Sequence, residues 1–357
     1  MSRLGERWLA AAYAGSPWLV ALWPLEALYR VAVARRRAAF AAGRRSAWRA
    51  PVPVIVVGNL TLGGTGKSPL VAWLVRHLAA QGWRPGILSR GYGGRSQAYP
   101  LRVDDHTPAA QCGDEPRMLA DQTGVPVVAD PDRPRGARRL LAEGCDILIS
   151  DDGLQHLALA RDLELVVVDG ARGFGNGRCL PAGPLREPLS RLASVDAVVI
   201  NGAAVNGVAR VAPPPGAFAM ELAPQAWRRL DSAERQPLAP LPFAGAVHAV
   251  AGIGRPARFF ETLAGLGVEA IPHPFGDHHA FRAEELAFGD GRPLVMTAKD
   301  AVKCRGLAPA EGWVLEVAAA PEPGFVAWLD ERLAALQGVG PDDTNSRAGP
   351  LPAHHQE

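Results

Sequence analysis

Short apolar runs recur along the chain and alternate with segments whose apolar residues are spaced three or four positions apart. The runs are typical of strands buried on both faces, and the wider spacing is typical of helices. Their alternation predicts an α/β fold built on a mostly parallel sheet flanked by helices. The runs that support this lie between residues 51 and 215: VIVVG (54–58), GILS (86–89), VPVVA (125–129), CDILIS (145–150), LELVVV (163–168) and DAVVI (196–200).

A second alternation predicts a smaller α/β domain over residues 242–337. Between the two domains, residues 216–241 are rich in Pro and Ala, which indicates a linker or hinge. Residues 338–357 lack apolar periodicity, and we expect this tail, with His354 and His355, to be disordered. The expected elements of the smaller domain are strands in 246–252, 293–297 and 313–319 and helices in 254–267 and 325–337.

The first 50 residues differ from the rest. The stretch WLAAAYAGSPWLVALWPL (8–25) has no charged residue but is interrupted by Gly15, Pro17 and Pro24, so a spanning helix is only a minor alternative. Aromatic residues followed by an arginine cluster favour a helical segment lying on an anionic cytoplasmic leaflet. A helix packed on the core, with its arginines in solvent, is the other alternative.

Composition indicates the class of protein and the cellular compartment. The chain has 357 residues, 48% of them apolar, and a net charge of +2, although nine arginines against two glutamates make residues 1–50 locally basic. The four cysteines are scattered, which indicates a reducing, cytosolic compartment without structural zinc. No cleavable signal peptide is evident. We expect neither a nucleic-acid partner nor an obligate protein partner.

The stretch VIVVGNLTLGGTGKSPL (54–70) places a glycine-rich loop between an expected strand and an expected helix. A phosphate cradle needs inward backbone N–H groups, a lysine for the outer phosphates and a hydroxyl for the metal. Thr61 stands where the strict Walker pattern has glycine, yet a nucleotide site remains the favoured interpretation over a plain turn. Its expected nucleotide-binding residues are Thr61, Leu62, Gly63, Gly64, Thr65, Gly66, Lys67 and Ser68.

Asp151 and Asp152 follow the apolar run 145–150 directly. A carboxylate at the end of a strand beside a phosphate loop is typical of the Walker B position, where it helps to hold Mg²⁺. The alternative is a plain strand-to-turn sequence.

Other polar clusters are weaker signals. Asp114 could cap a helix that starts near it, Glu187 could lie in a surface turn, and His278 could lie in a solvated loop or orient a base. Lys299 follows a strand, and the SRGYGGR turn (89–95) suits an anion or a simple tight turn.

Seven motifs in one order carry a family resemblance. The chain resembles the tetraacyldisaccharide 4′-kinases of Gram-negative bacteria, also called lipid A 4′-kinases, from about residue 53 to 303, and the first fifty residues look like that family's membrane-associated amino-terminal helix. The family's loop itself departs from the strict Walker pattern, which accounts for Thr61. The motifs are GNLTLGGTGKSP, LSRGYGG, GDEP, DDGLQH, LPAGPLREP, FGDHH and TAKDAVK.

The resemblance implies transfer of the ATP γ-phosphate to the 4′-hydroxyl of a tetraacyldisaccharide 1-phosphate, giving lipid IVA at the cytoplasmic face of the inner membrane. It implies a P-loop NTPase-like core, ATP and Mg²⁺ as cofactors, and Lys67 on the phosphates. By the same resemblance Asp114 is the base and His278 its partner, while Asp151 and Asp152 position metal and substrate. The implied metal residues are Ser68, Asp151 and Glu187, and Glu187 is also implied to assist nucleotide binding.

Three other functions remain open from the sequence. A membrane-associated switch or assembly ATPase would hydrolyse nucleotide without a lipid acceptor, and a soluble small-molecule kinase would need no lipid or detergent. A nucleotide-binding scaffold would not need Asp114 or Asp151.

Overall fold

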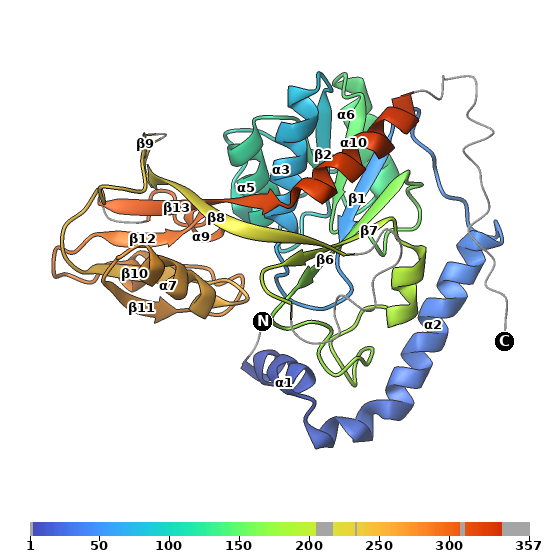
Figure 1. Ribbon diagram of the computed structural model, residues 1–357, viewed down its shortest axis with the longest axis horizontal. Helices are drawn as coiled ribbons and strands as arrows, with labels where there is room; N and C mark the ends of the chain where they lie inside the picture. The colour runs from blue at the N-terminus through green and yellow to red at the C-terminus, as the bar shows by residue number, and fades with distance from the viewer. Residues whose placement is uncertain (1–2, 205–216, 233, 308–310, 338–357) are drawn as a thin grey trace.

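Both groups of strands belong to one sheet in the computed structural model, which describes residues 3–204, 217–232, 234–307 and 311–337 (Figure 1). The sheet has 13 strands in the order β11-β10-β12-β13-β8-β7-β6-β1-β5-β2-β4-β3, and β9 pairs with β8. The strands are β1 (Val54–Gly58), β2 (Pro85–Ser89), β3 (Leu101–Val103), β4 (Val127–Ala129), β5 (Ile147–Asp151), β6 (Leu163–Asp169), β7 (Ala197–Asn201), β8 (Ala217–Arg229), β9 (Arg235–Gln236), β10 (Val247–Ala251), β11 (Ala270–Pro274), β12 (Leu294–Thr297) and β13 (Gly312–Pro321).

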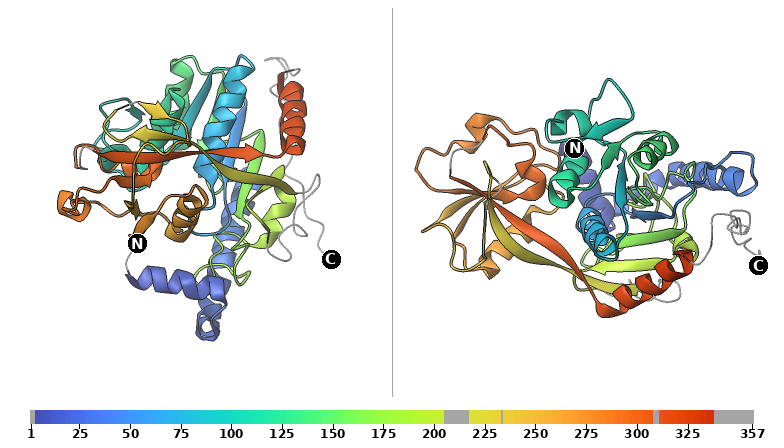
Figure 2. Two further views of the ribbon diagram at one scale, coloured as in Figure 1. Left: turned by 60° about the vertical axis from the view of Figure 1, so that its left-hand side comes forward. Right: turned by 90° about the horizontal axis from the view of Figure 1, so that it is seen from above.

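Helices cover both faces of this mixed, mostly parallel sheet, as expected for an α/β fold (Figure 2). The helices are α1 (Arg3–Ala14), α2 (Trp23–Ala41), α3 (Lys67–Ala80), α4 (Ala109–Cys112), α5 (Asp114–Thr123), α6 (Arg133–Ala142), α7 (Pro256–Gly265), α8 (Ala283–Leu286), α9 (Ala298–Ala301) and α10 (Pro323–Gln337), with 3₁₀ turns η1 (Pro17–Leu22) and η2 (Leu189–Ser194). We call β1–β7 with α3–α6 the first lobe, and β10–β12 with α7–α9 the second lobe.

Strand β1 shows how the first lobe is packed. All five of its residues are buried, and successive side chains point to opposite faces of the sheet. Ile55 and Val57 join a core formed with α3, α5 and α10, whereas Val54 and Val56 join a second core formed with α6. The sheet therefore has a complete hydrophobic layer on each side, which explains the unbroken apolar runs in the sequence.

The segment predicted as a linker contains an extended strand. Strand β8 pairs with β7 through residues 217–220 and runs antiparallel to β13 along residues 220–229. Pro224, inside this strand, lies where the register between β8 and β13 shifts by one residue, and a bulge tolerates a residue without an N–H. An ordered two-stranded ribbon thus joins the lobes, and its action as a hinge stays a prediction. The expected disordered tail, residues 338–357, lies outside the described part of the chain.

The amino-terminal segment forms α1, η1 and α2. Gly15, with a φ of 67°, and Pro17 separate α1 from η1, as the sequence predicted. Pro24 does not break a helix a second time, because it stands in the first turn of α2, where a missing N–H costs nothing. Among the described residues, no helix is long and apolar enough to cross a membrane.

Helix α2 is attached to the first lobe through a buried carboxylate. Glu26 is 3% exposed and accepts hydrogen bonds from Arg178 Nη1 at 2.9 Å and from the backbone N–H of Cys179 at 3.0 Å. Tyr29 adds a hydrogen bond from its hydroxyl to the carbonyl of Arg186 at 2.7 Å. These contacts fix the helix against the loop that precedes η2.

Candidate active site

The glycine-rich loop connects β1 to α3, which begins at Lys67. Gly63 and Gly66 have φ values of 99° and 97°, in the left-handed region that favours glycine. Gly66 has a second reason to be glycine, since an added Cβ would lie 2.4 Å from Asn201 Nδ2. The loop therefore has the conformation and the helix N-terminus that a phosphate group requires.

Thr61 takes part in backbone pairing with the segment around Leu185. It forms an isolated antiparallel bridge with Leu185 and is 3% exposed, and its φ is not positive. Leu62 continues this pairing, because its N–H donates to the carbonyl of Pro184 at 2.9 Å. Extended backbone at this point needs no glycine, which is a physical reason for the departure from the strict Walker pattern.

Asp151 lies at the end of β5, directly beside the strand that leads into the loop. It pairs in register with Val57 and is completely buried. Neither of its carboxylate oxygens has a hydrogen-bond partner in the described protein. Burial, and then the nearby Glu115, raise the pKa of Asp151 well above its usual range.

Asp152 is in a contrasting environment although it is the next residue. Its carboxylate lies 3.5 Å from Lys67 Nζ, and both of its oxygens accept from Arg186 Nη1 at 3.0 Å. Burial alone would raise the pKa of Asp152, but Lys67 and Arg186 hold it well below the usual range. The pair is thus divided into an ion-paired carboxylate and a buried, unpaired one.

Asp114 and His278 come together from different lobes. Asp114 is the first residue of α5, so it lies at the expected helix start, but the N-cap is Gly113 and Asp114 does not cap the helix. His278 lies in the loop between β11 and α8. His278 Nδ1 lies 3.0 Å from Asp114 Oδ2. His278 has a φ of 61°, so the loop holds it in a conformation that non-glycine residues seldom adopt. The dyad suggested by the resemblance is therefore geometrically present.

Lys299 contacts this dyad and lines the same cavity as the glycine-rich loop. Its Nζ lies 3.2 Å from Asp277 Oδ1, 3.5 Å from Glu115 Oε1 and 3.4 Å from His278 Nε2. Burial alone would lower the pKa of Lys299, but Glu115 and Asp277 raise it above its ordinary value. Glu115 and Lys299 also line a cavity together with residues 64–69, so the dyad borders the cavity that contains Lys67 and Ser68.

Glu187 is placed differently from the other expected metal residues. It is buried, and its carboxylate accepts from Arg37 Nη1 at 3.2 Å and from Gln155 Nε2 at 2.9 Å, with Arg191 Nε at 3.5 Å. Two arginines already neutralise it, so a role at the nucleotide and magnesium site stays a prediction. Across the described residues, no three His, Cys, Asp or Glu side chains converge in a way that could hold a metal ion.

Magnesium can nevertheless be held by few protein ligands, because it keeps several waters and binds the phosphates themselves. Ser68 and Asp151 fit this requirement. Ser68 follows Lys67 at the start of α3 and lines the cavity, and the two unpartnered oxygens of Asp151 are the type of donor that the ion prefers.

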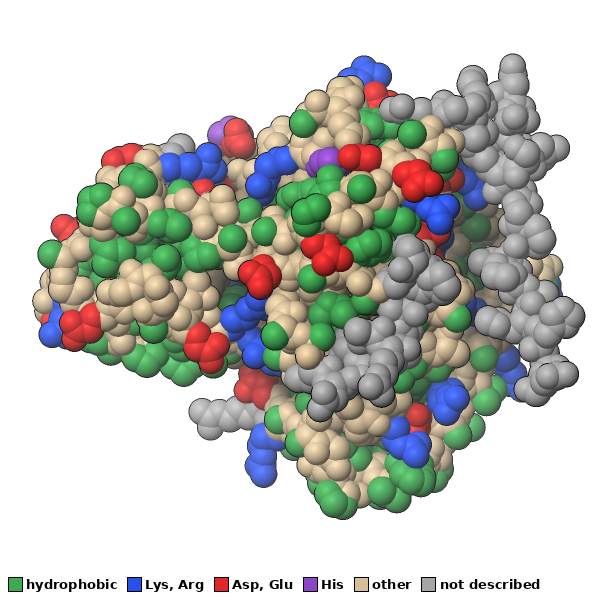
Figure 3. Space-filling model, in the orientation of Figure 1, with side chains coloured by type: hydrophobic (Ala, Val, Ile, Leu, Met, Phe, Trp, Pro, Cys, Tyr) green, Lys and Arg blue, Asp and Glu red, His purple; other side chains and the backbone are tan. Residues whose placement is uncertain are grey.

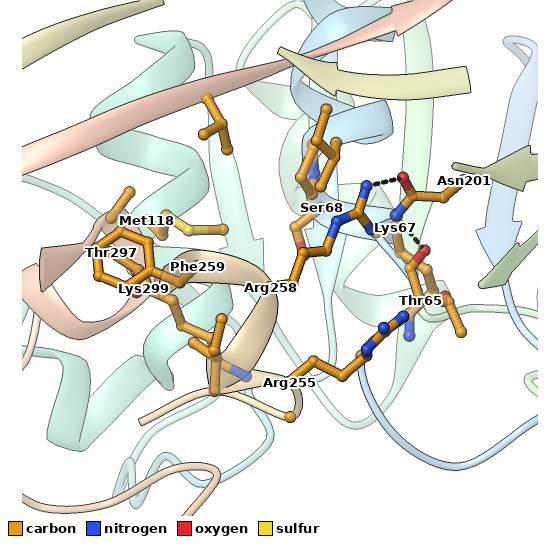
Figure 4. A pocket seen from close by; sticks show the side chains of 18 of the residues that line it. Thr65, Lys67, Ser68, Met118, Asn201, Arg255, Arg258, Phe259, Thr297 and Lys299 are labelled. Atoms are coloured by element: carbon orange, nitrogen blue, oxygen red, sulfur yellow. Dashed lines mark hydrogen bonds between the residues drawn. The ribbon is translucent and has the colours of Figure 1, made fainter. Parts of the chain in front are cut away.

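Among the cavity residues that the sequence analysis missed, four carry charged or amide groups that the site can use. Asp169 and Asn201 end the apolar strands β6 and β7, the same signal that identified Asp151, and could have been found. Arg255 and Arg258 were treated only as part of a helix. They flank the start of α7 and extend from the second lobe into the cavity, as Figure 4 shows.

Comparison with known proteins identifies the family. The profile described as tetraacyldisaccharide-1-P 4′-kinase matches residues 18–334. The chain belongs to this family. Relatives named tetraacyldisaccharide 4′-kinase include one from Pseudomonas aeruginosa, 55% identical over 332 residues, and one from Azotobacter vinelandii, 54% identical over 334 residues. Each alignment covers 93% of this chain and 98% of the relative.

A solved member of the family has the same fold. The crystal structure of LpxK from Aquifex aeolicus in complex with ATP matches with a TM-score of 0.75 at 29% identity. The match covers 89% of this chain and 99% of that one, so it extends over both lobes.

Proposed function

We propose that this chain transfers the γ-phosphate of ATP to the 4′-hydroxyl of a tetraacyldisaccharide 1-phosphate, giving lipid IVA in lipid A biosynthesis. The observation that carries this proposal is the Asp114–His278 pair beside a cavity lined by Lys67 and Ser68. A phosphate cradle alone suits any nucleotide-hydrolysing protein. A carboxylate–histidine pair brought from the second lobe to its border is suited to activating an acceptor hydroxyl.

Asp114 accepts the proton of the sugar 4′-hydroxyl while the hydroxyl oxygen forms a bond to the γ-phosphorus. The bond between the γ-phosphorus and the β,γ-bridging oxygen breaks, and ADP leaves. His278 Nδ1, 3.0 Å away, orients the carboxylate. A sugar hydroxyl is a weak nucleophile, so a positioned base contributes, while alignment and charge neutralisation by Lys67 contribute more.

Ser68 and Asp151 hold Mg²⁺ in this proposal. When bound, the ion neutralises charge on the outer phosphates and fixes their orientation. Asp152 supports this arrangement through Lys67, since its carboxylate lies 3.5 Å from Lys67 Nζ and keeps the lysine at the loop.

The acceptor carries acyl chains, so we place the reaction at the cytoplasmic face of the bacterial inner membrane. Seven of the eight large apolar side chains that are prominently exposed in the described chain belong to α1, η1 and α2. Figure 3 shows apolar side chains at the lower end of the molecule, where α1 leads into α2. They are Leu4, Trp18, Val20, Trp23, Leu25, Leu28 and Val31. Apolar side chains near arginines suit an anionic lipid surface.

Labelling of the acceptor tests the proposal. The purified full-length chain is incubated in detergent with γ-labelled ATP, Mg²⁺ and the disaccharide monophosphate, with Asp114→Ala in parallel. We expect label in a lipid product for wild type and almost none for the variant. ATP hydrolysis that ignores the acceptor would favour a switch ATPase. Activity on a small sugar without lipid or detergent would favour a soluble kinase, and no turnover would favour a scaffold.

A further inference from the structure

Two arginines at the start of α7 extend from the second lobe into the cavity formed by the glycine-rich loop. Arg255 precedes α7, and Arg258 lies in its first turn, three residues later. Figure 4 shows Arg258 reaching from α7 toward Asn201. Both side chains are partly buried, and both line the cavity with Lys67 and Ser68.

The two arginines differ in what neutralises them. Arg255 Nη1 lies 2.8 and 2.9 Å from the two oxygens of Asp169, which is a close ion pair. Arg258 Nη2 donates at 3.0 Å to the amide oxygen of Asn201, which is neutral. Within the described residues, no carboxylate forms an ion pair with Arg258, so its charge remains uncompensated.

The balance of charged residues that line the cavity also singles out Arg258. Four cationic side chains, Lys67, Arg255, Arg258 and Lys299, face two anionic ones, Glu115 and Asp169. Asp169 neutralises Arg255, and Glu115 lies 3.5 Å from Lys299. Lys67 pairs with Asp152, which lies outside the lining, at 3.5 Å. Arg258, from the second lobe, is therefore left as the surplus positive charge of the lining. A polyanion such as a triphosphate is the ligand that this surplus suits.

Asn201 gives Arg258 a fixed position relative to the loop. Its amide nitrogen donates to the carbonyl of Thr65 at 3.0 Å while its oxygen accepts from Arg258. Asn201 is 3% exposed, so one buried amide contacts the loop of the first lobe and the arginine of the second. The guanidinium keeps further N–H donors for another acceptor.

We propose that Arg258 is a phosphate-binding residue for the outer phosphates of the nucleotide, supplied by the second lobe opposite Lys67. It stabilises the charge of the phosphoryl group during transfer, as arginines do in other phosphoryl-transfer sites. Asn201 is a positioning residue that aligns Arg258 with the loop. The phosphate site is therefore complete only when both lobes contribute. This assignment rests on the kinase activity proposed above, but its binding test needs no lipid acceptor.

The test compares Arg258→Met with Arg258→Lys and with Arg292→Met, an arginine of the second lobe that does not line the cavity and pairs with Asp290 at 3.1 Å. Affinities for ATP and AMP are measured by calorimetry on the full chain in detergent, and kcat and KM by lipid labelling. We expect Arg258→Met to lower ATP affinity about tenfold or more with AMP affinity unchanged, and kcat/KM about 10²- to 10³-fold. Arg258→Lys recovers part of both, and Arg292→Met matches wild type.

Two results would overturn the assignment. Unchanged ATP affinity and turnover in Arg258→Met would remove Arg258 from the phosphate site. Equal losses for ATP and AMP would mean that the substitution disturbs the lobe and not a phosphate contact. If wild type binds ATP but labels no lipid, the kinase proposal fails, while the ATP-to-AMP comparison still decides the role of Arg258.

Discussion

Asp114 and His278 meet between the two lobes, with His278 Nδ1 3.0 Å from Asp114 Oδ2 although 164 positions separate the residues. Asp114 begins α5 of the first lobe, and His278 follows β11 of the second. A relative movement of the lobes would change this distance. The dyad is therefore linked to the same arrangement of the lobes that brings Arg258 to the glycine-rich loop.

The first prediction concerns this dyad. Asp114→Asn keeps the size of the side chain but cannot accept a proton, so we expect kcat to fall about 10²- to 10⁴-fold. His278→Asn removes only the orienting partner, so the loss should be smaller. Initial rates of lipid labelling at saturating ATP measure both effects.

The neighbouring histidine is the matched control. His279 lies beside His278 but bonds to Glu285, with Nε2 3.0 Å from Oε2. His279→Asn should keep kcat within a few fold of wild type. If it reduced kcat as much as His278→Asn, the whole loop and not the dyad would be responsible.

The second prediction concerns Lys67. Lys67→Met removes the charge of the loop and one of the cations that hold Asp152 ionised, since Lys67 Nζ lies 3.5 Å from Asp152 Oδ1. We expect kcat/KM for ATP to fall about 10²- to 10³-fold. Arg84→Met, on an arginine whose side chain is 73% exposed and pairs with Asp146, is the control. Labelling of the lipid by Lys67→Met at the wild-type rate would contradict the phosphate site itself.

The third prediction concerns the amino-terminal segment. Trp18→Ser and Leu28→Ser remove exposed apolar surface from η1 and α2, with side chains 54% and 68% exposed. We expect weaker cosedimentation with vesicles that contain anionic lipid, and slower labelling of vesicle-bound acceptor, because each buried apolar side chain contributes roughly 1.5–3 kcal/mol. Leu28→Met is the matched control. Equal vesicle binding by all variants would argue that this surface does not contact lipid.

Whether the sequence predicts a part of this site depends on how far apart along the chain the interacting residues lie. The glycine-rich loop and Asp151 were identified because strand, loop and helix lie close together in sequence, and the apolar run of β5 ends directly at Asp151. The strand predicted over 313–319 corresponds to β13, but β8 and its pairing with β13 were missed, because that pairing is long-range and β8 lies in a segment rich in Pro and Ala. The pairing of Arg255 with Asp169 spans 86 positions, and no local pattern indicates such a contact.

The last prediction uses the titration of Asp151. Burial raises the pKa of Asp151 most, and the charge of Glu115 raises it further. Between the ordinary pKa of Asp and this raised pKa, the folded protein keeps a proton on Asp151 that the unfolded chain has released. This carboxyl therefore lowers the free energy of unfolding as pH rises from about 4, the ordinary value for Asp, to its raised pKa.

We expect Asp151→Asn to remove this decline, so that its stability relative to wild type improves between pH 4 and pH 8 while kinase activity is lost. Urea unfolding at several pH values measures the difference. Asp146→Asn, just before the start of β5, is the control. Its carboxylate forms only a solvent-exposed ion pair with Arg84, and such pairs contribute little to stability, so we expect this variant to keep the decline that Asp151 causes. Parallel profiles for Asp151→Asn and wild type would show that Asp151 is ionised in the fold without cost, and its buried oxygens would then need another cation.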